Sequence, residues 1–148
     1  MTTDLLDVNV LMALTNPNHV HHHLAHRWFA DLTGWATTPA TEAALVRLTL
    51  NPTVMGRPVE PAEALTVLTG LRQLPRHRFQ PDDASLAEPA VDLAPWRGHA
   101  QTTDFQLINL CARHGLVLAT FDRKLAACLL PADRRWVEVI GDAVTAGG

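Results

Sequence analysis

The chain has 148 residues, a formal net charge of −3, and 47% hydrophobic against 18% charged residues. This composition is typical of one folded domain and excludes intrinsic disorder, and no apolar run is long enough to span a bilayer. The mild acidity argues against a nucleic-acid partner, because such proteins usually carry a basic surplus. Yet 11 of the 12 basic residues are arginine, the side chain that grips phosphate with two hydrogen bonds.

Asp4 and Asp7 stand where a secretory signal would carry lysines and an apolar stretch, so we expect a cytoplasmic protein with no membrane association. Residues 1–141 are expected to form a single domain, and residues 142–148 a flexible tail.

Strands and helices are predicted to alternate along the chain. The first strand, at residues 4–8, is expected to lead into a loop around Asn9, and it is followed by an amphipathic helix at 19–32 that buries Val20, Leu24 and Trp28. Further strands are expected at 35–37, 78–79, 116–120 and 136–140, and further helices at 38–51, 61–74, from Pro81-Asp82-Asp83, at 102–114, and after Asp122. This alternation predicts a parallel sheet in an α/β sandwich.

Four acidic residues fall where the predicted strands end or the following helices begin: Asp7, Glu42, Asp104 and Asp122. These points share one edge of an open parallel sheet, the edge at which ligands bind. Four carboxylates without a compensating Lys or Arg would repel one another unless a cation lay among them. Hard oxygen ligands without clustered cysteine indicate Mg²⁺ or Mn²⁺.

Each of these residues also has a structural interpretation. Asp104 and Asp122 are suited to capping helices, and Glu42 to the positive end of a helix dipole. Asp7 is the hardest to explain in this way, because it follows an apolar strand and has no predicted helix to cap. Asp4 is excluded from the site. It precedes Asp7 by three residues on the same strand, so its side chain faces the opposite side of the sheet.

The segment from His19 to His26 invites a zinc interpretation. On a helix, His19 and His23, and likewise His22 and His26, are spaced to chelate one metal ion. No further cluster of His or Cys completes a tetrahedral site, however, and the helix needs a polar face opposite its apolar stripe. The sequence leaves open whether these histidines bind anything.

Four segments match a known family in the expected order: Leu5 to Leu11, Pro39 to Glu42, Thr103-Asp104, and His114 to Asp122. Together they resemble the PIN-domain nucleases, and most closely the VapC toxins of type II toxin–antitoxin modules. The resemblance covers residues 4–140 and implies a PIN-like three-layer α/β/α sandwich with a mainly parallel central sheet.

The resemblance further implies cleavage of RNA by an endoribonuclease that uses one or two Mg²⁺ or Mn²⁺ ions. It implies restraint by a VapB-type antitoxin and assembly on a toxin homodimer, with tRNA or ribosomal RNA as plausible substrates. The acidic quartet would be Asp7, Glu42, Asp104 and Asp122, with Glu42 reaching the metal through water or orienting the nucleophile. Asn9 and Thr120 match supporting positions. Arg123 and Lys124 stand where some relatives carry another acid, so the sequence does not decide whether a full second metal site exists.

Four basic residues are candidates to hold substrate phosphate: Arg97, His99, Arg123 and Lys124. Two other functions remain open. A catalytically silent protein of the same fold would only bind RNA or a partner. A haloacid-dehalogenase-type phosphatase also places an Asp after its first strand, but it needs an acid where Asn9 stands, and a lysine, of which the chain has only Lys124.

Overall fold

The computed structural model describes residues 2–141, so the predicted tail at 142–148 lies outside the described residues. Its centre is a five-stranded sheet in which every pair of neighbouring strands is parallel. The spatial order is β3-β2-β1-β4-β5. The strands are β1 (Thr3–Leu6), β2 (Trp35–Thr37), β3 (His77–Phe79), β4 (Leu116–Thr120) and β5 (Val137–Val139).

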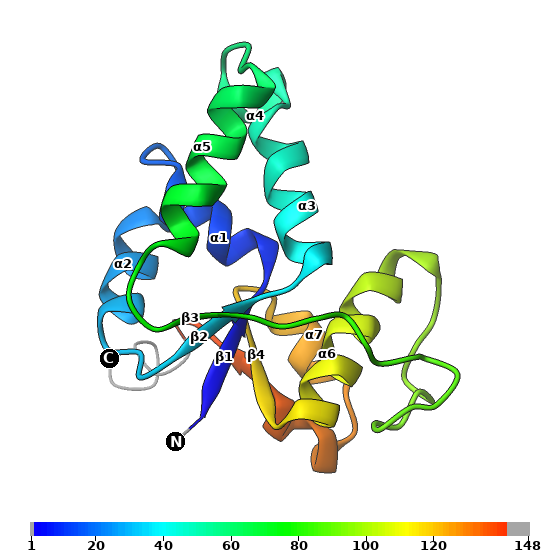
Figure 1. Ribbon diagram of the computed structural model, residues 1–148. Helices are drawn as coiled ribbons and strands as arrows, with labels where there is room; N and C mark the ends of the chain where they lie inside the picture. Colours follow the sequence, from blue (N-terminus) through cyan, green and yellow to red (C-terminus); the bar gives the residue numbers. More distant parts are fainter. Residues whose placement is uncertain (1, 142–148) are drawn as a thin grey trace.

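Helices cover both faces of this sheet (Figure 1). One face carries α1 (Val8–Thr15), α2 (His22–Ala30), α3 (Pro39–Thr49), α4 (Pro52–Met55) and α5 (Pro61–Arg72). The other carries α6 (Thr102–His114) and α7 (Arg123–Cys128), with 3₁₀ turns at His99–Gln101 and Pro131–Trp136. The expected three-layer sandwich with a parallel sheet is confirmed.

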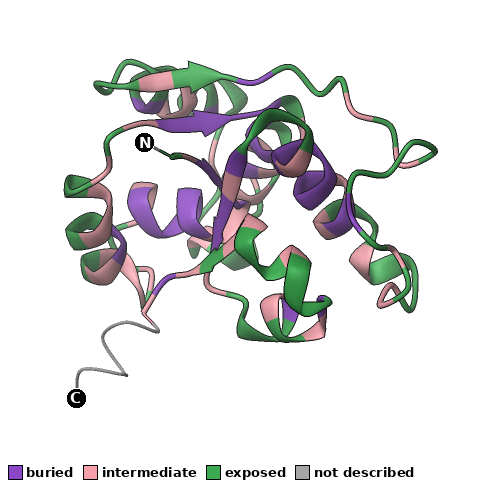
Figure 2. Ribbon diagram, turned by 90° about the horizontal axis from the view of Figure 1, so that it is seen from below, coloured by how far each residue is buried: buried purple, intermediate pink, exposed green. Residues whose placement is uncertain are grey.

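Two apolar cores follow from the alternation of side chains along β1. Leu5 packs with Phe105 and Ile108 of α6 on one face. Leu6, the next residue, packs on the other face with the buried side of α1, including Leu11. Because both faces of the sheet are covered, its strands are apolar throughout, and Figure 2 shows the buried residues gathered in the central strands and the helices against them. None of the helices in residues 2–141 combines the length and the apolar character needed to cross a bilayer.

The N-terminal part of the chain differs from the prediction. Residues 8–15, expected as strand end and loop, form α1, so Asn9 lies in a helix. An eight-residue apolar segment buried against the sheet has no polar face, and a periodicity search therefore cannot recognise it. The next helix starts only at His22, which leaves Val20 outside it and 86% exposed instead of buried.

Two further expectations are wrong. Pro81-Asp82-Asp83 opens no helix. Its aspartates instead bind the side of α6: Asp82 accepts a hydrogen bond from Gln106, and Asp83 pairs with His114. The sequence also spaces Leu65, Leu68 and Leu71 or Arg72 for one buried face of the helix at 61–74. On α5 this stripe is incomplete, because Leu71 is buried but Leu65 is 53% exposed.

Candidate active site

Asp7 and Asp122 follow two neighbouring parallel strands. β1 ends at Leu6 and β4 at Thr120, and the ladder between them continues where the Asp7 N–H donates to the Ala119 carbonyl (2.9 Å). Each aspartate also caps the helix that follows it. Asp7 Oδ1 accepts from Val8 N (2.7 Å), and Asp122 Oδ1 accepts from the backbone of the first turn of α7. The view that Asp7 has no helix to cap is therefore wrong.

Thr120 and Asn9 join these two strand ends through hydrogen bonds. The Thr120 hydroxyl donates to Asp7 Oδ2 (2.8 Å) and accepts from Asn9 Nδ2 (3.2 Å) and from Asp122 N (3.1 Å). Asn9 Oδ1 in turn accepts from Phe121 N (3.4 Å). One buried hydroxyl thus has all its donor and acceptor capacity in use, and this orients the Asp7 carboxylate.

The Asp7 carboxylate is buried, with only 8% of the residue exposed. Burial raises its pKa, the hydrogen bonds from Thr120 and Val8 lower it, and the charge of Asp122 raises it again. The net shift is upward, so the site holds Asp7 in a place where its negative charge is costly.

Asp104 lies in the first turn of α6 and is half-buried. Within the described residues, its carboxylate has no hydrogen-bond or ion-pair partner. Burial, followed by repulsion from Asp7 and Asp122, raises the pKa of Asp104 to about 6. The three aspartates therefore act on one another electrostatically although they come from three separate parts of the chain.

Glu42, in the first turn of α3, belongs to a different set of contacts. It accepts a hydrogen bond from the buried Thr37 hydroxyl (2.6 Å) and pairs with Arg72 of α5 (3.4 Å). The same Thr37 oxygen lies 2.7 Å from His77 Nε2. The expectation that all four acids lack a compensating cation is wrong for Glu42, because α5 brings Arg72 to it across thirty residues of sequence.

The chemistry of Asp7, Asp104 and Asp122 suits a divalent cation. Carboxylate oxygens are hard ligands, and a cation would relieve the repulsion that raises the pKa of Asp104. In residues 2–141, no three His, Cys, Asp or Glu side chains are grouped closely enough to hold an ion as they are placed. Binding would therefore require a side chain to rotate or water to complete the coordination.

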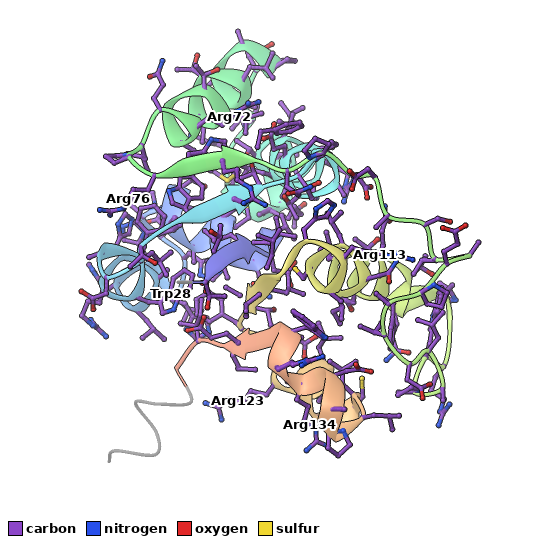
Figure 3. The ribbon with its side chains drawn as sticks, turned by 60° about the horizontal axis from the view of Figure 1, so that its bottom comes forward. Trp28, Arg72, Arg76, Arg113, Arg123 and Arg134 are labelled. Carbon is purple, nitrogen blue, oxygen red and sulfur yellow. The ribbon has the colours of Figure 1, made fainter. Side chains whose placement is uncertain are left out.

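The four basic candidates lie on exposed parts of the surface. Arg123 and Lys124 begin α7 beside Asp122, and His99 opens the 3₁₀ turn before α6. The Arg97 guanidinium donates to the Ala94 carbonyl (2.7 Å). Its charge lowers the pKa of the Cys128 thiol, which burial and the charges of Asp104 and Asp122 raise. Figure 3 shows Arg123 well away from Arg72, the partner of Glu42.

The histidine-rich segment has a structural role. His22 Nδ1 lies 2.7 Å from the Ala13 carbonyl, and His26 Nε2 lies 2.9 Å from the Leu14 carbonyl. Carbonyls in the last turn of a helix have no partner within it, so these rings cap α1 and join it to α2. Two of the ring nitrogens that zinc would need are engaged in this way.

Two features were missed from the sequence. His21 stacks on Phe121 (ring centroids 4.6 Å apart), beside Asp122. Buried Asp4 faces Glu138 of β5, which also accepts from Trp28 Nε1 (3.0 Å). The sequence signal for this contact was a charged residue within a buried strand, which needs a polar partner.

Comparison with known proteins identifies the family. The model of the PIN domain matches residues 5–128, so the chain belongs to the PIN-domain family. Within that family its curated relatives are VapC ribonucleases. It is 49% identical to Ribonuclease VapC39 of Mycobacterium tuberculosis over 84% of this chain and 91% of the relative. It is 46% identical to Ribonuclease VapC38 of the same species over 80% and 84%.

Two solved structures share the fold at low sequence identity. M. tuberculosis VapC20, described as a sarcin–ricin-loop-cleaving toxin, superposes with a TM-score of 0.59 at 15% identity, covering 86% of this chain and 96% of that one. Rickettsia felis VapBC2, solved with a promoter DNA fragment, gives 0.62 at 12% identity, covering 93% and 98%. The resemblance to PIN-domain VapC proteins inferred from the motifs is thus confirmed.

Proposed function

We propose that this protein is an endoribonuclease that needs Mg²⁺ or Mn²⁺ and acts as the toxin of a toxin–antitoxin pair. The names of its relatives support RNA as the substrate. The observation that carries the proposal is the mutual repulsion of Asp7, Asp104 and Asp122 at one edge of the sheet. Repulsion between carboxylates does not stabilise the fold, whereas a site that binds a cation needs clustered negative charge.

The chain's own residues have separable tasks in this proposal. The Thr120 hydroxyl and Val8 N–H hold the Asp7 carboxylate, with Asn9 supporting Thr120. Asp104 accepts no side-chain hydrogen bond from any residue between 2 and 141, so its oxygens are available as ligands. Asp122 uses Oδ1 as a helix cap and keeps Oδ2 for the site. A bound divalent cation would supply an activated water and neutralise charge on the phosphodiester.

Glu42 has a more distant role in the proposal. Its contacts with Thr37 and Arg72 fix the carboxylate, so we expect it to orient the attacking water or to reach a cation through water. The exposed basic side chains of Arg97, His99, Arg123 and Lys124 are proposed to hold phosphates of the RNA backbone.

We further propose a VapB-type antitoxin as partner and a homodimer as the assembled state. The solved structure of the R. felis neighbour is of a VapBC2 protein pair, which supports a partner of that kind. The haloacid-dehalogenase alternative is set aside, because the chain belongs to the PIN family. That alternative also needs an acidic residue at position 9, where Asn9 instead donates a hydrogen bond to Thr120.

Removal of the metal tests this function. The purified chain, incubated with total RNA, should cleave it in Mg²⁺ or Mn²⁺, lose all cleavage in EDTA, and recover when the cation is restored. The absent charge neutralisation alone should slow cleavage by at least about a hundredfold, which places the remaining rate below detection in this assay. Cleavage that persists in EDTA would contradict the metal mechanism. RNA binding without cleavage under every cation tested would favour the silent binding protein.

A further inference from the structure

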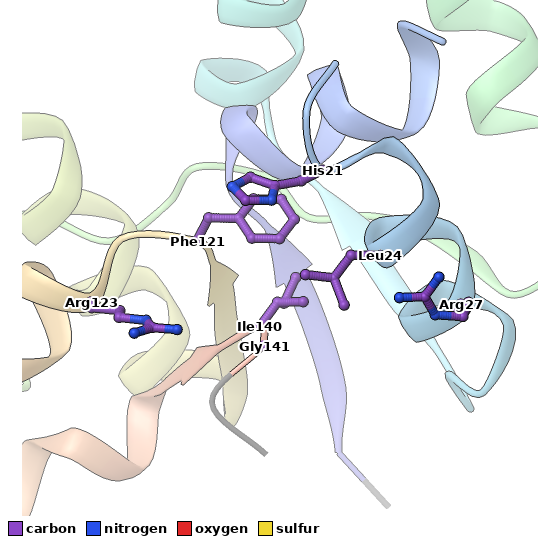
Figure 4. Close-up of a pocket in the computed structure, with 7 residues that line it drawn as sticks. All are labelled: His21, Leu24, Arg27, Phe121, Arg123, Ile140 and Gly141. Atoms are coloured by element: carbon purple, nitrogen blue, oxygen red, sulfur yellow. The ribbon is translucent and has the colours of Figure 1, made fainter. Parts of the chain in front are cut away.

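An open pocket of about 460 Å³ lies beside the proposed catalytic edge (Figure 4). α2 and the segment before it supply one wall, the turn between β4 and α7 the opposite wall, and the end of β5 the floor. Its volume is within the ~300–1,000 Å³ range of pockets that bind small organic groups. It is lined by His21, Leu24, Arg27, Phe121, Arg123, Ile140 and Gly141.

The centre of this pocket is flat and apolar. His21 and Phe121 are stacked with an angle of 23° between their rings, and Leu24 and Ile140 lie below them in the close-up. The His21 ring makes no hydrogen bond in the described chain; the hydrogen bonds of this residue, to His19 and Ala25, come from its backbone. An aromatic surface of this kind suits a nucleobase, because every base has a π-face that stacks on such side chains.

The rim of the pocket is positive. The guanidinium groups of Arg27 and Arg123 face it from opposite sides (Figure 4). Arg27 is exposed in the last turn of α2, and its side chain has no hydrogen bond or ion pair with any described residue. A flat apolar centre between two cations is complementary to a base that carries a phosphate on each side.

The pocket is continuous with the acidic site. Phe121 directly precedes Asp122, and its backbone N–H is held by Asn9, which also bonds Thr120. We propose that this pocket is the binding subsite for an RNA nucleotide next to the scissile phosphate, with its base against the His21–Phe121 stack and a flanking phosphate on Arg27. This inference rests on the proposed function for the identity of the substrate.

The test compares His21→Ala and Arg27→Ala with the matched controls His23→Ala and Arg47→Ala, which alter exposed residues outside the pocket. A fluorescein-labelled single-stranded RNA of mixed sequence is titrated in EDTA, so that binding is measured without cleavage. An RNA of equal length that lacks bases is titrated in parallel. A 2-aminopurine reporter in a third RNA measures stacking.

Each pocket variant should weaken RNA binding by about 5- to 20-fold, whereas each control should change it by less than about twofold. Arg27→Ala should also make the dependence of binding on salt less steep, by about 0.7 in the logarithmic slope. His21→Ala should abolish the quenching of 2-aminopurine and should have no effect on the strand without bases. In Mg²⁺, both variants should raise KM with little change in kcat.

Unchanged RNA affinity in both pocket variants would overturn the proposal, and so would a loss of affinity for an antitoxin that leaves RNA binding intact. The proposed function fails separately. If the wild-type chain never cleaves RNA, that function is wrong, while the comparison in EDTA still decides whether the pocket binds a nucleotide.

Discussion

The Asp104→Asn variant is expected to cleave RNA at least a hundredfold more slowly than the wild type and to be more stable. Asparagine keeps the shape but removes a charged ligand of the proposed cation, and losing one group that stabilises transition-state charge typically costs about 10²–10³ in rate. The stability should rise because the substitution breaks no hydrogen bond within residues 2–141 and removes the repulsion of Asp104 by Asp7 and Asp122.

The gain in stability should depend on pH. The pKa of Asp104 is raised to about 6 from 3.8, so the folded protein holds this proton more tightly than the unfolded chain. Its ionisation therefore costs stability as pH rises from about 4 to 6, and the cost is complete above that range. Because Asp104 is only half-buried, the gain at pH 8 should be about 1 kcal/mol, vanishing near pH 4.

Urea unfolding at several pH values checks this prediction, together with single-turnover cleavage in Mg²⁺. Asp31→Asn, at the exposed end of α2, is the matched control and should change neither rate nor stability. Asp7→Asn should lose activity without the gain in stability. Both Asp7 oxygens accept hydrogen bonds, and the amide NH2 group would replace the oxygen that accepts from either the Thr120 hydroxyl or Val8 N–H. An Asp104→Asn variant that retains full activity would remove Asp104 from the mechanism.

Asp4→Asn is expected to stabilise the protein at alkaline pH and to leave cleavage unchanged. Asp4 is 6% exposed, and its Oδ2 atom has no donor among the described residues. Burial, then a hydrogen bond with Glu138 and the charge of that residue, raise the pKa of Asp4 to about 8. Asparagine has the same shape but cannot ionise, so it removes the cost of a buried negative charge beside Glu138.

The sign follows from the raised pKa. The wild type should lose stability as pH rises between about 4, where unfolded Asp4 ionises, and about 8, where the folded residue does. Asp4→Asn lacks this loss, so the difference between the two proteins should grow to about 2 kcal/mol above pH 8. Urea unfolding across this range measures it. A difference that does not vary with pH would mean that Asp4 ionises normally.

Much of the fold could be predicted because its strands and caps carry strong local signals. Leu116–Thr120 is a continuous apolar run ended by Asp122, and Thr38-Pro39 begins a helix; the structure has β4 and α3 at these positions. α1 escaped prediction because a short helix buried on nearly all sides looks like a strand. Val20 was misplaced because α2 begins two residues after it.

The candidate site was predictable to the extent that topology decides it. Knowing that β1 and β4 are parallel neighbours is enough to bring Asp7 near Asp122. The contacts of Glu42 were not predictable, because Arg72 arrives from a helix whose angle depends on packing. The His21–Phe121 stack is likewise a contact between distant segments, and neither residue has a pattern that indicates it.

Titration with Mn²⁺, followed by electron paramagnetic resonance, tests the central claim most directly, namely that the three aspartates form a cation site. The wild type should bind one or two Mn²⁺ ions, and Asp104→Asn should bind them at least about tenfold more weakly. Asp31→Asn should match the wild type. Equal Mn²⁺ affinity in the wild type and Asp104→Asn would contradict the account.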